Sequence, residues 1–503
     1  MILRCVFGPP LRRLLYGLLS ILPLLAAGGC AVNPATGEQS FTAFMSPQQE
    51  AAIGQEEHPK LVKEFGGAYA DADLGAYVAR IGQSLARHSE APDVPFTFTV
   101  LNDDKVNAFA LPGGFVHVTR GLLALADDEA ELAGVLAHEI GHVVARHTAQ
   151  RYSRAMATNL GLTVLGVLGS VYGVPSQLGQ AATVGAQAYL QGFSREQELE
   201  ADLLAVRYLA RAGYDPQAMT SFLDKMRAHG ELEAMLAGKP VGSVDEFNLM
   251  ATHPRTLDRI AQAMELAREA PVGQPMRERE RFLASIDGMV FGDDPQQGVR
   301  IGRDFRHPDL GIGFTVPPGF VLFNGARQVV ARGPGEAIFA FDMAPGDAVR
   351  QSSDPFVYLS RMWARELNLT DTERLDINGM PAATGRALAR TRSGDRELRL
   401  VVIRDRSDRL YRILFVAPPA EAARHRTEFQ RTTYSFHRLT PQEIAAIRPL
   451  RLDVHTVAPG DTVDSLSARM PFDSYRAERF LALNGLGRDQ PLIPGTQVKL
   501  VVD

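Results

Sequence analysis

Two histidines four residues apart are the part of the sequence best suited to chemistry. They lie in the segment His138-Glu139-Ile140-Gly141-His142. On an α-helix, His138 and His142 are separated by about 40° around the axis, so both imidazoles can meet one zinc ion. Glu139 is offset by about 100°, where it can reach a zinc-bound water rather than the metal. The spacing predicts a metal site with a general base; the alternative is two helix-face histidines that bind nothing.

A zinc ion that performs hydrolysis needs a third protein ligand and one open position. His147 follows His142 by five residues, and on a continuous helix its side chain would point about 140° away. We therefore expect His147 at the protein surface rather than at the metal.

A second segment, which starts at Ser194, offers a carboxylate for the third position. Ser194 and Gln197 have the form of a capping box, which predicts that a helix begins here. Glu198 and Asp202 then share one face of that helix, whereas Glu200 points to the other side. We predict that Glu198 completes a His₂Glu zinc site and that Asp202 accepts the free N–H of a ligating imidazole. The alternative is that these acids form a solvated face.

The elements that must position these residues follow from local patterns. Asp128 and Glu131 have the form of a capping box, so we expect a long helix to open at Asp128 and to run through both histidines. Alternating residues predict a strand from Phe96 to Leu101, and a second strand, Gly114 to Thr119, follows a Pro-Gly turn. This second strand is a candidate edge onto which an extended polypeptide adds as one more strand. The alternative is an ordinary buried strand.

In these pieces the chain resembles the gluzincin zinc metallopeptidases of family M-48, the group that includes HtpX and the CAAX prenyl proteases. The matching pieces are Asn107 to Gly114, Gly121-Leu122-Leu123, the His-Glu-Ile-Gly-His core, Ser194-Arg195 through Glu198 to Asp202, and His253-Pro254 with Arg259-Ile260. The resemblance implies that one zinc ion is bound by His138, His142 and Glu198. It also implies that Glu139 is the general base and that His253 is an active-site histidine.

The reaction implied by this resemblance is peptide hydrolysis. Zinc polarises the scissile carbonyl and activates water, while Glu139 takes the proton of that water and later protonates the leaving amine. His253 would donate to the developing oxyanion or act as a reversible fourth ligand. The alternative for His253 is a plain helix-start histidine before Pro254.

A long uncharged segment separates the two parts of the predicted site. Residues 155–194 carry no formal charge and are rich in Gly and Ala. Their most apolar run, Leu160 to Val174, is shorter than a membrane span and ends at Pro175. Two interpretations remain open: a buried helical hairpin, or a mobile lid over the zinc cleft.

The first thirty residues have the pattern of an export signal. Three arginines precede an apolar run that ends in small residues: Arg4, Arg12, Arg13, Leu14 to Ala27 and Gly28-Gly29-Cys30. We predict a lipoprotein signal peptide over 1–29 and lipidation at Cys30. Because Ala31 rather than Asp follows the cysteine, we expect a lipid anchor in the outer membrane, facing the periplasm. The alternative, an uncleaved transmembrane anchor, falls short of the roughly 20 residues required and is interrupted by Pro23.

Length, charge and cysteine content restrict the number of domains, the kinds of partner and the possible disulfides. A chain of 503 residues predicts about three domains. The 53 basic and 58 acidic residues give a net charge of −5, so the chain has no electrostatic footprint for nucleic acid. The cysteines are Cys5 and Cys30, so no disulfide can form beyond residue 30.

The expected architecture is multidomain. Residues 30–270 should form a mainly α-helical zincin-type metallopeptidase domain with a small β-sheet, followed by a linker over 271–300. Residues 301–440 have the pattern of an α+β domain, in which no chemistry is evident. Residues 453–503 are predicted as a separate βααβ unit that resembles a LysM glycan-binding module, which implies a peptidoglycan tether. A purely structural role is the alternative for this last unit.

Taken together, these features favour a lipid-anchored periplasmic zinc endopeptidase that cleaves unfolded or misassembled envelope proteins. The first alternative is a zinc-dependent peptidoglycan peptidase, which the LysM-like unit suggests. The second alternative is a non-catalytic, chaperone-like envelope assembly factor. The complete set of zinc ligands and general base argues against it.

Overall fold

The structure is a computed structural model that describes residues 30–35, 37, 39–42, 45–151, 153, 192–236, 257–269, 272–391 and 394–503. The predicted signal peptide, most of the uncharged segment and His253 lie outside the described residues, so the predictions made for them stay predictions. Among the described helices, none is both long enough and apolar enough to cross a membrane.

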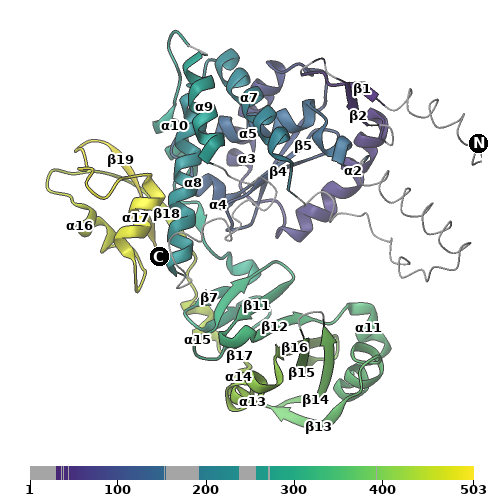
Figure 1. The fold of residues 1–503 in the computed structure, drawn as a ribbon. Helices are drawn as coiled ribbons and strands as arrows, with labels where there is room; N and C mark the ends of the chain where they lie inside the picture. The colour runs from purple at the N-terminus through teal and green to yellow at the C-terminus, as the bar shows by residue number, and fades with distance from the viewer. Residues whose placement is uncertain are drawn as a thin grey trace, which may run out of the picture.

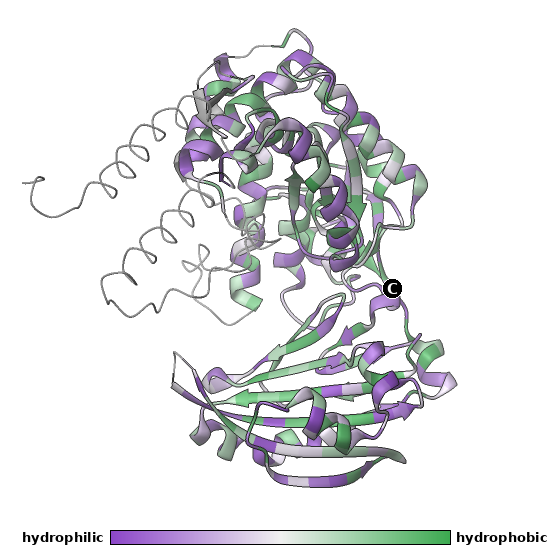
Figure 2. Ribbon diagram, turned by 90° about the vertical axis from the view of Figure 1, so that its right-hand side faces the viewer, coloured by the Kyte–Doolittle hydropathy of each residue, from purple (hydrophilic) through white to green (hydrophobic). Residues whose placement is uncertain are grey.

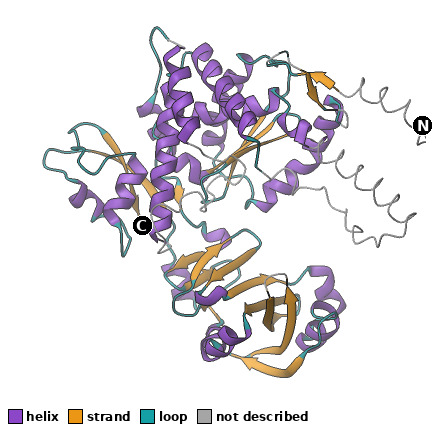
Figure 3. Cartoon of the chain, in the orientation of Figure 1, coloured by secondary structure: helices purple, strands orange, loops and turns teal. Residues whose placement is uncertain are grey.

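The helical part of the molecule surrounds a small sheet (Figures 1 and 3). Within the described residues its helices are α2 (Pro47–Glu64), α3 (Ala72–Arg87), α4 (Arg120–Leu125), α5 (Glu129–Val144), α7 (Arg195–Ala212), α8 (Gln217–Leu236) and α9 (Leu257–Glu269). The sheet contains β3 (Thr97–Leu101), β5 (Phe115–Thr119) and β4 (Ala108–Leu111), in that spatial order. A short hairpin of β1 (Cys30–Val32) and β2 (Gln39–Phe41) precedes them.

The predicted edge strand is the central strand of the small sheet. β5 pairs in parallel with β3 on one side and antiparallel with β4 on the other. The sequence patterns predicted one strand pair and missed β4. Gly113 and Gly114 have φ values of 81° and 93°, and this left-handed turn folds β4 back onto β5. An added polypeptide strand cannot pair with β5, because both of its edges are occupied.

The helix that carries His138 and His142 lies at the centre of the largest hydrophobic core. In α5, the side chains of Leu132, Leu136 and Ile140 are 0% exposed. The core also includes residues from α3, β5, α7 and α8. A helix that is buried on nearly every side holds its side chains in fixed directions, which a metal site requires.

The segment 271–300, predicted as a linker, is largely part of the folded core. It contains α10 (Arg279–Ile286), β6 (Val290–Phe291), the 3₁₀-helix η3 (Pro295–Gln297) and the start of β7 (Val299–Ile301). Phe282, Leu283 and Ile286 of α10 are 0% exposed and belong to the same core as α5. The linker prediction is therefore wrong, because these apolar residues at helical spacing bury one face of α10.

The C-terminal unit has the predicted strand-helix-helix-strand order but is not separate. It consists of β18 (Leu450–Thr456), α16 (Val463–Ser467), α17 (Arg476–Asn484) and β19 (Gln497–Val502), with β18 pairing antiparallel to β19. β18 also pairs with β6, and Phe480 and Leu500 belong to the core that contains α5. Figure 1 shows this unit, coloured yellow, beside α8.

The remaining part is β-rich, and in Figure 2 its strands form a curved body below the helical part. Among the described residues, one sheet has the order β10 (Val321–Asn324), β11 (Gln328–Arg332), β12 (Ile338–Met343), β16 (Arg409–Ala417), β15 (Gly394–Arg406), β14 (Met380–Thr391) and β13 (Thr370–Ile377). A smaller sheet has the order β17 (His437–Arg438), β9 (Ile312–Thr315), β8 (Asp304–His307) and β7. The helical segments are α11 (Gly346–Gln351), α12 (Pro355–Tyr358), the π-helical η5 (Leu359–Trp363), α13 (Pro419–Arg424), α14 (Arg426–Ser435) and α15 (Pro441–Ala446), with 3₁₀-helix η4 (Pro334–Glu336). The sequence patterns missed β14, which contains Pro381 and Gly385 and therefore lacks a strand-like composition.

Candidate metal centre

Two capped helices present the predicted ligands. Asp128 caps α5 by accepting a hydrogen bond from the backbone N–H of Glu131, at 2.9 Å. In the predicted capping box, the Glu131 carboxylate would accept from the backbone N–H of Asp128. It accepts from the N–H of Asp127 instead, one residue earlier. In α7 the full capping box of Ser194 and Gln197 is present.

The two helices approach closely at Gly141. A Cβ atom at this position would lie 3.3 Å from the carbonyl oxygen of Ala201 and 3.3 Å from Cβ of Leu204. The absence of a side chain therefore lets α7 approach the face of α5 that carries the histidines.

The side chains of His138, His142 and Glu198 meet at one point. Nε2 of His138 lies 3.1 Å from Nε2 of His142. The Glu198 carboxylate faces both rings, with Oε2 at 3.5 Å from His138 Nε2 and Oε1 at 3.6 Å from His142 Nε2. All three residues are buried, and their ligand atoms lie within 4.8 Å of one another. Two imidazole nitrogens and one carboxylate are the donor set of catalytic zinc sites, so these residues fit that ion.

Asp202 lies on the far side of the His138 ring, one helical turn after Glu198. Its Oδ1 is 2.9 Å from Nδ1 of His138, which leaves Nε2 of that ring directed at the cluster. Burial alone would lower the pKa of His138, but its hydrogen bonds to Asp202 and Glu198 raise that pKa to about 9.

Arg259 of α9 joins both carboxylates, a contact that the sequence patterns did not predict. Its guanidinium donates to Asp202 through Nε and Nη2, both at 2.7 Å, and its Nη1 lies 2.6 Å from Oε2 of Glu198. Burial raises the pKa of Asp202, but the hydrogen bonds from Arg259 and His138 more than offset it and lower that pKa. Arg259 belonged to the family resemblance, and that was the available signal for its importance.

His147 is buried beside the cluster, so the prediction that it lies at the surface is wrong. Its side chain is 0% exposed, and its Nδ1 lies 2.8 Å from Nδ1 of His142. The prediction assumed a continuous helix, but α5 ends at Val144 and Arg146 has a φ of 55°. Arg146 is held in this left-handed turn by hydrogen bonds to the Glu50 carboxylate and the Met45 carbonyl. The turn directs His147 back toward His142.

Three further residues complete the surroundings of the cluster. Phe193, the residue before the cap of α7, stacks on the His142 ring with centroids 3.9 Å apart, a contact that the sequence did not reveal. Glu139 is 0% exposed and is adjacent in sequence to His138. Glu200, predicted to lie on the other side of its helix from Glu198 and Asp202, contacts His147: its Oε2 lies 3.2 Å from Nε2 of that ring.

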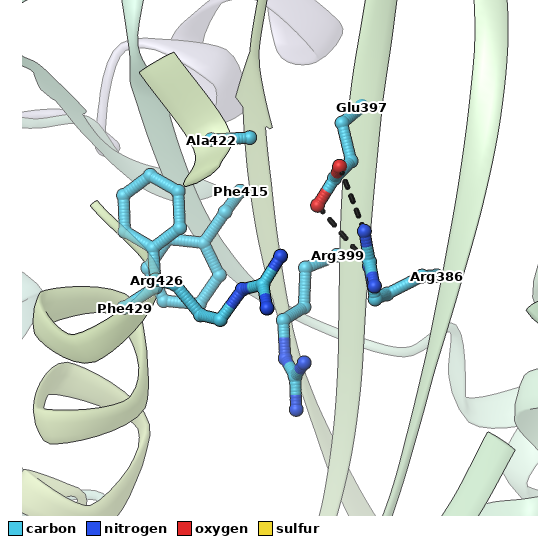
Figure 4. A pocket seen from close by; sticks show the side chains of 7 residues that line it. All are labelled: Arg386, Glu397, Arg399, Phe415, Ala422, Arg426 and Phe429. Atoms are coloured by element: carbon cyan, nitrogen blue, oxygen red, sulfur yellow. Dashed lines mark hydrogen bonds and ion pairs between the residues drawn. The ribbon is translucent and has the colours of Figure 1, made fainter. Parts of the chain in front are cut away.

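A separate hollow lies on the β-rich part (Figure 4). Its polar lining is formed by Arg386, Glu397, Arg399 and Arg426, and Glu397 is already bonded to Arg386 at 2.9 Å. Its lining contains no histidine and no second carboxylate, so among the described residues this hollow does not offer the ligands of a metal site.

The buried His₂Glu cluster between two packed helices has the donor set of a catalytic zinc site, and residues 73–267 match the model of Peptidase family M48. The chain is therefore similar to that family over 195 of its 503 residues.

The most informative relatives are bacterial. The chain is 35% identical over 205 residues to the Beta-barrel assembly-enhancing protease of Escherichia coli (strain K12), which covers 40% of each protein. It is 33% identical over 263 residues to the protein of the same name from Yersinia pestis, covering 51% of this chain and 52% of that protein. The Mitochondrial metalloendopeptidase OMA1 of Schizosaccharomyces pombe is 30% identical over 232 residues, covering 44% of this chain and 62% of that protein. The chain thus matches between 40% and 62% of the length of these three relatives.

Solved structures give weaker similarity. The solution structure of Cyanobacterial PsbP from Synechocystis sp. PCC 6803 aligns with a TM-score of 0.23 and 16% identity, covering 29% of this chain and 98% of that one. We draw no conclusion from a similarity of this size.

Proposed function

We propose that the chain is a zinc-dependent endopeptidase of the bacterial cell envelope that cleaves unfolded or misassembled periplasmic and outer-membrane proteins. The observation that carries the proposal is the convergence of His138 and His142 on both carboxylate oxygens of Glu198. The names of the bacterial relatives support the substrate class, since they describe proteases that enhance β-barrel assembly.

In the proposed peptide hydrolysis, the zinc ligands, Glu139 and His253 have different roles. His138, His142 and Glu198 would hold a zinc ion, which would supply Lewis-acid activation of water and of the scissile carbonyl. Glu139 accepts the proton of the attacking water and delivers it to the leaving amine, so that the carbonyl carbon gains hydroxide and the amine gains hydrogen. His253 donates to the developing oxyanion or closes the site as a reversible ligand, a role that rests on the resemblance alone.

The location is part of the same proposal. Residues 1–29 act as a signal peptide, Cys30 carries the lipid, and the protein faces the periplasm from the outer membrane. Residues 453–503 hold it near peptidoglycan if their LysM-like order reflects glycan binding. No nucleic acid partner is expected, because the net charge is −5.

The test compares the protein with its Glu139→Gln variant on three substrates: casein, an unfolded outer-membrane protein and muropeptides. We expect the wild-type protein to cleave the two proteins, and the variant to lose about 100-fold or more of that activity with unchanged zinc content. Glu56→Gln, a substitution at an exposed carboxylate, is the matched control. Cleavage of muropeptides alone would favour the peptidoglycan peptidase. Equal activity of Glu139→Gln in an envelope-assembly assay would favour the chaperone-like factor.

A further inference from the structure

A chain of hydrogen-bonding side chains runs from the ligand His142 to the N-terminal hairpin. Nδ1 of His142 lies 2.8 Å from Nδ1 of His147, and Nε2 of His147 lies 3.2 Å from Oε2 of Glu200. Oε1 of Glu200 accepts a hydrogen bond of 2.6 Å from Nδ2 of Asn33. Asn33 directly follows β1, the first strand of the hairpin, and lies three residues after Cys30.

Metal binding by His142 would determine which nitrogen of each histidine in this hydrogen-bonded series carries the proton. A histidine that binds metal through Nε2 carries its proton on Nδ1, so His142 donates and Nδ1 of His147 accepts. A neutral His147 then carries its proton on Nε2 and donates it to Glu200. The Glu200 carboxylate accepts from both His147 and Asn33, so each contact has a donor and an acceptor.

The contacts of this hydrogen-bonded series are mostly shielded from solvent. His147 and Asn33 are 0% and 4% exposed, and the Glu200 side chain is 24% exposed, so both partners of the carboxylate are shielded from water while the carboxylate itself is partly exposed.

The two ligand histidines are therefore oriented in different ways. Nδ1 of His138 lies 2.9 Å from the carboxylate of Asp202, which Arg259 anchors. His142 reaches its carboxylate through the intervening ring of His147. Groups that hold the second nitrogen of a ligating imidazole fix its direction and raise its basicity, which increases metal affinity.

We propose that His147, Glu200 and Asn33 form a positioning relay that holds His142 for metal binding and couples the N-terminal hairpin to the metal site. The inference rests on the proposed zinc site and adds to it three positioning residues, none of which touches the metal. Displacement of the hairpin weakens the hold on His142, so the order of the segment next to Cys30 affects the retention of zinc.

The first test measures zinc affinity by competition with a chelator for three single variants of the full chain. In His147→Leu the ring and both hydrogen bonds are lost, and we expect zinc affinity to fall by roughly 10- to 100-fold. In His147→Asn the side chain keeps one acceptor and one donor, and we expect it to recover most of that loss. His117→Leu removes another fully buried histidine, one that lies 2.9 Å from His58 instead, and should bind zinc as the wild-type protein does.

The second test addresses the hairpin. Asn33→Asp keeps the oxygen that accepts from the backbone N–H of Ala35, but it replaces the donor to Glu200 with a second carboxylate oxygen. Like charges at this distance repel, so we expect weaker zinc binding and faster zinc loss. This variant remains informative if His147→Leu fails to fold.

The outcomes separate the relay from the zinc site itself. If the wild-type protein binds no zinc, the proposed function fails. If the wild-type protein binds zinc but His147→Asn loses as much affinity as His147→Leu, the hydrogen bonds of His147 do not position His142. Unchanged zinc affinity in Asn33→Asp would overturn the coupling to the hairpin.

Discussion

The amine of Lys499, in the last strand of the chain, lies 3.0 Å from Oδ1 of Asp127, which directly precedes the capping residue of the metal-binding helix. The same amine donates to the carbonyl oxygens of Ala124, Leu125 and Ala126 at the end of α4. Lys499 is 0% exposed, and burial lowers its pKa to about 8. This contact fixes the C-terminal unit to the start of α5.

The Lys499→Met substitution tests the importance of this contact. Methionine matches the length of the lysine stem but removes the partner of Asp127 Oδ1 and the donor to three carbonyl groups, while Lys225 still pairs with Asp127 Oδ2. We expect the free energy of unfolding to fall by about 3 kcal/mol, measured by urea denaturation. The control is Lys60→Met, which removes an exposed ion pair with Glu56 and should cost less than about 1 kcal/mol. Equal small losses in both variants would show that Lys499 does not hold the C-terminal unit.

The Gly141→Ala substitution tests the close approach of α5 and α7. The new Cβ would lie 3.3 Å from the Ala201 carbonyl oxygen, so α7 must move and carry Glu198 with it. We expect zinc affinity to fall by roughly 10-fold, because a ligand displaced by a few tenths of an ångström no longer fits the coordination geometry. Gly75→Ala in α3 is the control: its Cβ meets nothing within 4 Å, and the variant should be more stable by about 0.5–1 kcal/mol. Unchanged zinc affinity in Gly141→Ala would contradict this account of the packing.

The Arg259→Lys substitution tests whether the two carboxylates need a guanidinium rather than a positive charge. Lysine keeps the charge but cannot donate to Asp202 in a bidentate manner while also reaching Glu198. We expect zinc affinity to fall by roughly 10-fold and thermal stability of the zinc-loaded protein to fall with it. If Arg259→Lys binds zinc like the wild-type protein, charge alone is sufficient at this position.

Local patterns predicted the residues that meet in the site. The spacing of His138 and His142 and the capping box at Ser194 depend only on helix geometry, so the positions of Glu198 and Asp202 on one face could be predicted without tertiary information. The packing of α5 against α7 brings Glu198 to the two histidines, and local patterns do not predict it. Its only sign in the sequence is the small residue Gly141.

The errors concern features that depend on contacts between distant segments. The left-handed turn at Arg146 is stabilised by Glu50, and neither residue type signals such a turn, so the burial of His147 could not be predicted. The docking of the C-terminal unit depends on Lys499, a residue that is usually exposed. Pairing of β6 with β18 joins residues far apart in the chain, so the predicted linker gave no sign of it.

Two buried tyrosines, Tyr208 and Tyr214, and the partly buried Tyr77 make stability depend on alkaline pH. Tyr77 and Tyr214 donate to the Glu129 carboxylate, each at 2.6 Å, and Tyr208 donates to Glu90 at 2.6 Å. Burial and these hydrogen bonds raise the pKa of each phenol above its ordinary value. Since the unfolded chain loses these protons at about pH 10 and the folded protein retains them, the stabilisation is complete below that pH and is lost as the pH rises above it. Urea denaturation between about pH 8 and about pH 11 should show this loss, and Tyr208→Phe should reduce the slope above about pH 10 by up to about 1.4 kcal/mol per pH unit. The same slope in both proteins would mean that Tyr208 titrates alike in the folded and unfolded states.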